Sequence, residues 1–283
     1  MTWQVLILTS VFLYSISVLL QRILLKEEKS DPKTYAVFFQ LLTGLMIGMF
    51  GLVFADMSFP DVKPLVFNLV LMTLLYGFGN VLIFESLKRI EASRFTIIFS
   101  SRALFTILAS SLLLKEGLLA KQFVGTFLIL AGIALANVKA ARFSFSKKEA
   151  MALFAAMIFG FVNTNDRFLL KSFKVYPYVF LAFIVPALFI IALNPYTIKN
   201  MKFFVEKKVL LKMLLLCVIY AVSSITFFAS LQIAQSSSQV ASINLTSVIV
   251  IVLLAIIFLK ERDFLIPKLL GAASSFVGLL LVS

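Results

Sequence analysis

The chain has 283 residues, of which 61% are hydrophobic and 14% charged, and its mean hydropathy is +1.06. This composition is too apolar for a soluble globule of this length, so we expect an integral membrane protein. The net charge of +13 would favour nucleic acid in a soluble protein, but here the basic residues fall between apolar stretches, where they record orientation, and we expect no nucleic-acid partner.

Ten apolar stretches follow one another along the chain, and we predict that each is a membrane-spanning helix. In hydrocarbon only a helix or a closed barrel satisfies its own backbone, and these stretches lack the alternating period of barrel strands. At about 20 residues a span, the length leaves room for about ten helices and no sizeable soluble domain. The stretches are residues 3–25, 34–55, 65–87, 93–114, 121–138, 150–170, 176–193, 209–231, 239–259 and 265–282.

One pattern occurs twice in the chain. The segment YGFGNVLIFESL at 76–87 returns as YAVSSITFFASL at 220–231, with Tyr, Phe, Ser and Leu in register. The polar segment 140–148 separates the copies, so we predict one five-helix repeat at 1–140 and a second at 141–283. Because five is odd, the second copy is inverted, as in secondary transporters whose binding site lies near mid-membrane. The expected fold is an all-α membrane protein with ten transmembrane helices in two inverted five-helix repeats.

The basic residues also predict an orientation. Most of the 26 Lys and Arg residues fall in the loops on the side opposite the two termini. The positive-inside rule places those loops in the cytoplasm and both termini outside. We expect the cytoplasmic membrane of a prokaryote.

A longer pattern is also doubled, as RALFTILASSLLLKEGLLAKQFVGTFLILAGIALA at 102–136 and TSVIVIVLLAIIFLKERDFLIPKLLGAASSFVGLLL at 246–281. In each copy an apolar helix ends in Glu, and two glycines follow. These residues are Glu116, Gly125 and Gly132, then Glu261, Gly271 and Gly278. The doubled pattern resembles the paired signature of EamA-type proteins of the drug/metabolite transporter superfamily.

The resemblance implies a carrier of small metabolites, often an exporter. It also implies a central cavity lined mainly by the first, third and fourth helices of each repeat. The chain departs from the family pattern early in the fourth helix of each repeat, where members usually carry Pro. Here those positions hold Arg102-Ala103 and Ser247-Val248.

Arg102 is the sharpest candidate for substrate binding. Counted from Arg94, it lies roughly 12 Å into the membrane at 1.5 Å per residue. An unpaired Arg there costs several kcal/mol, so we expect it to face the bundle interior. In one interpretation the guanidinium of Arg102 binds a carboxylate or phosphate of the substrate, and in the other it forms a structural ion pair with Glu85.

Two acidic residues are candidates for proton coupling. Burial would favour the neutral form of Glu85, although Lys88 or Arg89 could form an ordinary helix pair with it. Asp166 is the second candidate, and an interfacial pair with Arg167 is the alternative. Histidine is absent and Cys217 is the only cysteine, so we expect no metal, no cofactor and no catalytic residues.

Tyrosines and amides within the spans complete the candidate site. Tyr14, Tyr76 and Tyr220 each need a hydroxyl partner deep in a span, so they either line a polar cavity or pack in the core. Asn80, Asn163 and Asn244 either orient substrate or join helices. Aromatic residues near span ends are expected to be interfacial anchors, namely Trp3, Tyr35, Tyr176, Tyr178 and Tyr196.

The sequence therefore predicts a transporter that moves a small polar or amphipathic metabolite by alternating access. Arg102 favours an anionic or zwitterionic substrate, such as an amino acid, and export is favoured over import. The alternatives are a flippase-like carrier of a lipid-linked substrate and a non-transporting membrane scaffold. The expected partners are the small-molecule substrate and the lipid bilayer, with the chain as a monomer or a weak homodimer.

Overall fold

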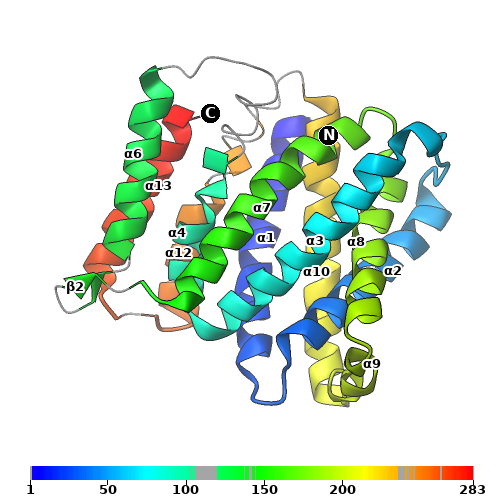
Figure 1. Cartoon of the computed structure of the whole chain (residues 1–283), viewed down its shortest axis with the longest axis horizontal. Coiled ribbons are helices and arrows are strands. Elements are labelled where there is room, and N and C mark those ends of the chain that lie inside the picture. Colours follow the sequence, from blue (N-terminus) through cyan, green and yellow to red (C-terminus); the bar gives the residue numbers. More distant parts are fainter. Residues whose placement is uncertain are drawn as a thin grey trace.

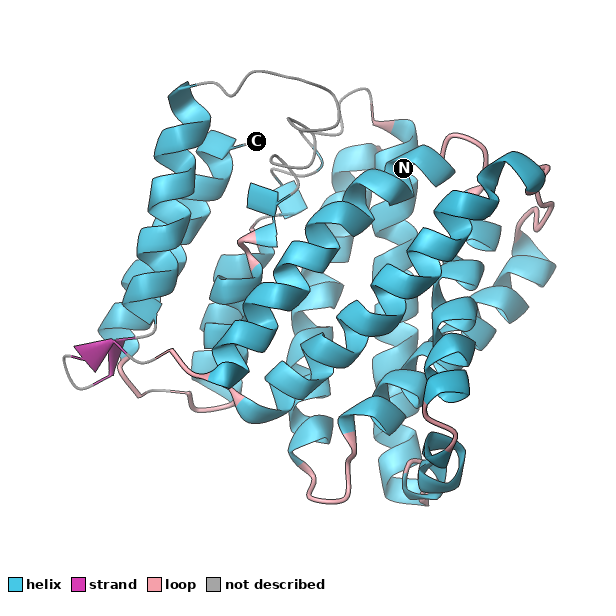
Figure 2. Cartoon of the chain, viewed as in Figure 1, coloured by secondary structure: helices cyan, strands magenta, loops and turns pink. Residues whose placement is uncertain are grey.

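The computed structural model is a bundle of helices (Figures 1 and 2). It describes residues 2–102, 104–105, 120–136, 138–139, 142–143, 145–234, 240, 243–244, 246–261 and 263–282. The α-helices are α1 (Trp3–Lys26), α2 (Pro32–Phe54), α3 (Val66–Arg89), α4 (Ala92–Phe99), α6 (Ala120–Ala136), α7 (Lys147–Leu169), α8 (Val175–Leu193), α9 (Tyr196–Asn200), α10 (Lys207–Ile233), α12 (Ser247–Phe258) and α13 (Leu265–Val282).

Short elements connect some of these helices. The 3-10 helix η1 (Lys63–Leu65) precedes α3, and η2 (Met201–Phe203) follows α9. Two-residue strands β1 (Val138–Lys139) and β2 (Arg142–Phe143) pair antiparallel between α6 and α7. The chain is therefore helical almost throughout its described part, as the composition predicts.

Five helices of the described part are long and apolar enough to cross a membrane: α1, α2, α8, α10, and α3 taken together with η1. Three shorter apolar helices lie within α6, α12 and α13. Each of the ten apolar stretches contains a described helix, although the fourth continues beyond the described residues. The helical membrane fold is confirmed, and the count of ten membrane crossings stays a prediction.

The side chains of α1 show how apolar surface and polar interior are divided. Val5, Leu8 and Phe12 are exposed on its outer face, where lipid would contact them. On its inner face, the Ser10 hydroxyl donates to the carbonyl of Ser223 in α10 at 2.9 Å, and the Ser223 hydroxyl donates back to the Ser10 carbonyl at 3.0 Å. Small hydroxyl residues thus join two helices, a common device inside membrane bundles.

Helices of the first half pack most extensively against helices of the second half. The main pairs are α1 with α10, α3 with α7, α2 with α8, α4 with α12 and α6 with α13. The doubled sequence matches α1 to α7 and α3 to α10. If the two halves are exchanged, the pair α1–α10 becomes the pair α7–α3. The pairs α2–α8, α4–α12 and α6–α13 each remain the same pair.

The glycines of the doubled pattern meet where α6 packs against α13, at one edge of the bundle (Figure 1). A Cβ placed on Gly132 would lie 2.6 Å from the carbonyl oxygen of Gly271, and one on Gly278 would lie 2.6 Å from that of Gly125. The partner number falls as the residue number rises, so the two helices run antiparallel. Glycine is required here because the backbones approach too closely for a side chain.

Two tyrosines expected at the membrane interface lie in the core instead. Tyr35 is fully buried, with its ring centroid 4.9 Å from that of Phe84, and Tyr178 is fully buried beside Phe228. The expectation was wrong because position near the end of an apolar stretch does not say which face of the helix a residue occupies. Tyr196, by contrast, is exposed in α9.

Candidate functional site

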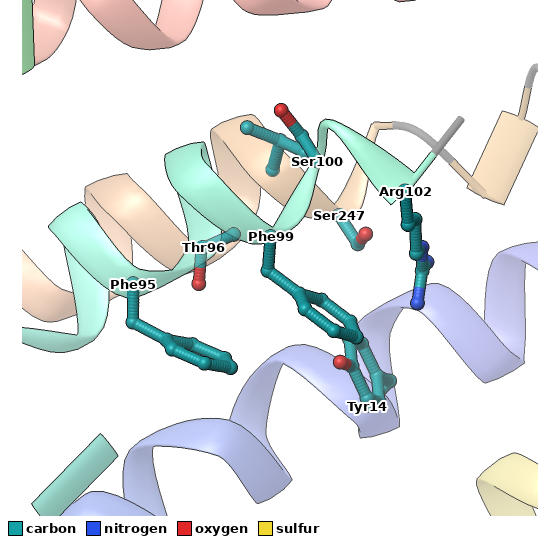
Figure 3. A pocket seen from close by; sticks show the side chains of 8 residues that line it. Tyr14, Phe95, Thr96, Phe99, Ser100, Arg102 and Ser247 are labelled. Carbon is teal, nitrogen blue, oxygen red and sulfur yellow. The ribbon is translucent and has the colours of Figure 1, made fainter. Parts of the chain in front are cut away.

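A small pocket lies where α1, α4 and α12 come together (Figure 3). It is thus formed between helices of the two halves of the chain. Aromatic rings and hydroxyls surround one guanidinium in it. The lining residues are Tyr14, Phe95, Thr96, Phe99, Ser100, Arg102, Ser247 and Val248.

Arg102 reaches the pocket because α4 ends early. The α-helix stops at Phe99, and the hydroxyls of Ser100 and Ser101 turn back to donate to the carbonyls of Ile97 and Ile98 at 2.6 and 2.7 Å. The Ile98 carbonyl also accepts the backbone N–H of Ser101 at 3.1 Å, and such hydroxyl bonds help to satisfy the carbonyls at a helix end. Arg102 follows this turn and extends towards α1 (Figure 3). No proline is used to break the helix at this point.

Two aromatic side chains hold the guanidinium of Arg102. Its Cζ lies 5.0 Å from the ring centroid of Phe99, the geometry of a cation–π interaction. Its side chain also hydrogen-bonds Tyr14. A guanidinium carries a planar fork of N–H donors, whose geometry matches a carboxylate or phosphate. The pocket therefore places a cationic group beside aromatic surface.

Tyr220 packs against Tyr14, which lines the pocket. Its ring centroid is 6.2 Å from that of Tyr14 and 4.9 Å from that of Phe39. Among the tyrosines predicted for the site, Tyr14 therefore lines the pocket and Tyr220 supports it.

A second polar cluster surrounds Asp166 of α7. This carboxyl is only 4% exposed, and each of its oxygens accepts one phenol hydroxyl. Tyr76 of α3 donates to Oδ2 at 2.8 Å, and Tyr178 of α8 donates to Oδ1. The neighbouring Asn165 exchanges two hydrogen bonds with Asn68 of α3, at 2.7 and 2.9 Å. Three helices therefore meet at one buried acid.

A row of three packed aromatic rings lies between Asp166 and the pocket. The ring of Tyr76 packs edge-on against Phe159, with centroids 5.6 Å apart. Phe159 in turn packs against Phe99, with centroids 5.4 Å apart, and Arg102 lies over the ring of Phe99. The two polar centres are thus separated by packed rings.

Among the remaining candidates, Asn80 and Glu85 bond to residues outside the pocket lining. Asn80 donates to the Gln40 side chain of α2 at 3.1 Å, so it joins two helices. Glu85 accepts two bonds from Arg89, at 2.8 and 3.0 Å, as the helical spacing allows. Asn244 is half-buried, and the side chain of Asn163 lies outside the described residues.

A buried charged cluster at the other end of α4 could not be recognised in the sequence. The N-cap residue Glu91 does not cap α4 with its side chain. Glu261, from the second half, does so instead. Its carboxylate accepts the backbone N–H groups of Ala92 and Ser93 at 2.8 and 3.0 Å, and the Ser93 hydroxyl at 2.7 Å.

Lys268 of α13 completes this cluster. Its ammonium is fully buried, lies 2.8 Å from the Glu91 carboxylate and donates to the Glu261 carbonyl at 3.1 Å. Arg94 adds a bond to the Ala136 carbonyl at 3.1 Å. The cluster connects the first residues of α4 with α6 and α13. Arg102 follows the opposite end of α4.

Comparison with known proteins gives three findings. The model of the EamA-like transporter family matches the chain twice, over residues 1–138 and 146–283. Solute carrier family 35 member B1 of Xenopus laevis is 33% identical over 96 residues, a match that covers 34% of this chain and 30% of that protein. A solved crystal structure has a TM-score of 0.65 and 14% identity, covering 97% of this chain and 95% of the other, which shows a shared fold. The family match spans almost the whole chain, which therefore belongs to the EamA-like transporter family.

Proposed function

We propose that the chain is a secondary transporter that moves a small anionic or zwitterionic metabolite, such as an amino acid, by alternating access. Export is the favoured direction. The observation that carries this proposal is the position of Arg102, which enters a pocket formed between helices of the two halves. Charged groups within membrane bundles are costly, face the bundle interior or a water-filled cavity, and often mark a substrate or ion pathway. Membership of a transporter family supports the same conclusion.

The substrate anion would bind the guanidinium of Arg102. Phe99 and Tyr14 hold that guanidinium in place, so little side-chain entropy is lost when the anion binds. The hydroxyls of Thr96, Ser100 and Ser247 line the same pocket and would bind the polar remainder of a zwitterion. Phe95 and Phe99 provide apolar surface for an aliphatic or aromatic substituent.

The proposal includes two inverted five-helix repeats, at 1–140 and 141–283, with ten membrane crossings. Two observations support it: the family model matches each half, and the main helix pairs are preserved when the halves are exchanged. The antiparallel contact of α6 with α13 fits the same symmetry. We place the chain in a prokaryotic cytoplasmic membrane with both termini outside, and labelling of a terminal tag in intact cells tests that orientation.

The substrate proposal is tested by thermal stability of the purified protein with anionic, zwitterionic and cationic metabolites. A solute that binds the folded state raises the melting temperature by mass action. We expect anions or zwitterions to stabilise the wild type and the Arg89→Ala control, whose Arg89 lies in an exposed pair on α3, but not folded Arg102→Ala. An Arg102→Ala variant that keeps every response would refute the role of Arg102.

Transport itself is tested by flux of the stabilising solute into proteoliposomes. A carrier accumulates or exchanges the labelled solute, and Arg102→Ala lowers the rate. Binding without flux would favour a non-transporting membrane scaffold. Movement of a lipid-linked form between leaflets, without movement of the free solute, would favour the flippase-like alternative.

A further inference from the structure

The environment of the Asp166 carboxyl differs from that of the other acidic groups in the described part of the chain. It is almost fully buried in a bundle helix and bonded to two neutral phenols, and its described contacts include no ion pair. Arg167, the next residue, is exposed. A permanently ionised carboxylate is costly to bury when no cation compensates it, and buried ionisable groups of membrane proteins often mark ion or proton pathways.

The hydrogen bonds of this cluster fit two protonation states. In the arrangement observed, both oxygens of Asp166 act only as acceptors, which is the pattern of the ionised group. A neutral carboxylic acid carries one O–H donor, so one phenol must then accept and turn its own hydroxyl elsewhere. Gain of a proton therefore requires only the rotation of one hydroxyl, without repacking of the helices.

We propose that Asp166, together with Tyr76 and Tyr178, is a proton-binding site. The carboxylate takes a proton from water on one oxygen and later returns it to water, and no other bond is made or broken. The polar groups that face it are Tyr76 and the Asn68–Asn165 pair from the α3 and α7 side, and Tyr178 from α8. From α10, the apolar ring of Phe228 packs on Tyr178.

Coupling of this proton to the substrate rests on the proposed function, whereas the proton site itself does not. Tyr76 is the shared element, because it bonds to Asp166 and packs on Phe159, which contacts the Phe99 ring beneath Arg102. Arg102 is also close enough to act electrostatically on Tyr76. An anion on Arg102 would weaken that field at Tyr76, and Tyr76 donates to Asp166. Through this shared tyrosine, anion binding and proton binding at Asp166 would favour each other.

Infrared difference spectroscopy of the protein in liposomes tests the proton site without a substrate. All 13 acidic side chains gain a carbonyl stretch when they are protonated, so the diagnostic signal is the difference between wild type and variant. We expect the spectrum of the wild type to contain a component from a buried protonated carboxyl that grows as the pH falls, and Asp166→Asn to lose this component. Glu85→Gln is the matched control, because Glu85 pairs with the half-exposed Arg89, and it should keep the component. Identical titration spectra for the wild type and Asp166→Asn overturn the proposal.

A second variant keeps the test decisive if Asp166→Asn does not fold. Tyr178→Phe removes one donor to the ionised carboxylate, so the midpoint of the component must move to higher pH. An unmoved midpoint in folded Tyr178→Phe would show that the component belongs to another group. Because the test uses no solute, its outcome is separate from that of the Arg102 experiment.

Discussion

Glu261→Gln is the substitution for which the structure predicts the clearest loss of stability. The carboxylate accepts three hydrogen bonds at the start of α4, one on Oε1 and two on Oε2. A glutamine keeps the shape but has only one acceptor oxygen. If that oxygen accepts the bonds from Ser93, the amide NH2 group faces the backbone N–H of Ala92. Both groups are donors, so the hydrogen bond to Ala92 is lost.

The magnitude follows from these contacts. Loss of a bond between a buried N–H and a charged acceptor costs about 1.5–3 kcal/mol. Loss of a negative charge at a helix N-terminus costs about 0.3–1 kcal/mol more. The expected decrease in the free energy of unfolding is therefore about 2–4 kcal/mol, which corresponds to about a 30- to 700-fold increase in the population of the opened state.

The single cysteine, Cys217, can be used to measure this loss of stability. It is fully buried and belongs to the same hydrophobic core as Phe95 and Ile98 of α4. A maleimide fluorophore can therefore label it only when the core opens. Where reclosing is fast, the labelling rate follows the population of the open form.

The matched control is the same chemical change at Glu85. Its partner Arg89 lies one turn further along α3 and is 51% exposed, so the pair contributes less than about 0.5 kcal/mol. Labelling of Cys217 in Glu85→Gln should rise by no more than roughly twofold. Equal labelling rates in the two variants would refute the argument that Glu261 caps α4.

Three other substitutions each have one expected effect on stability. Gly278→Leu should separate α6 from α13 and destabilise the protein by about 1–3 kcal/mol, measured by the same labelling, because its Cβ would lie 2.6 Å from the carbonyl oxygen of Gly125. Tyr35→Phe should slow labelling by several fold, because the buried Tyr35 hydroxyl has no hydrogen-bond partner among the described residues. At Asp56, bonds first to the Lys174 side chain and then to Ser58 lower the pKa of the carboxyl, so their contribution is present at neutral pH and is lost as the pH falls through that lowered value. Because both partners are exposed, this contribution is small, and Asp56→Asn should lower the neutral-pH melting temperature only slightly.

The sequence predicted features that depend on order along one helix. The doubled glycines were recognised because their spacing is local, and the structure shows their purpose as the contact between α6 and α13. The pair of Glu85 with Arg89 follows from helical spacing in the same way. The depth of Arg102 was counted from the nearest flanking charges and stays a prediction.

Features that depend on contacts between distant helices could not be predicted. Tyr178 lies near the start of an apolar stretch, and only the packing of α3, α7 and α8 shows that it bonds to Asp166. Glu261 was recognised as part of a doubled pattern, but its bonds to Ala92 and Ser93 join residues far apart in the sequence. A periodic pattern identifies the buried face of a helix but not the partner that this face meets.

In the proposed transport cycle, α4 would connect the Glu261 cap at its start to the Arg102 pocket beyond its end. Its first turn is bonded to Glu261 of the second half, and the turn after its last residue carries Arg102 into the pocket. The α-helix between them has only eight residues, all buried, so the two ends cannot move independently. A ligand shifts a conformational equilibrium only by its difference in affinity for the two states. If opening of the bundle separates Glu261 from α4, the lost hydrogen bonds must be offset by contacts that the substrate makes with Arg102 in the open state. Glu261→Gln should therefore raise the rate of exchange between states while lowering the stability of the resting protein.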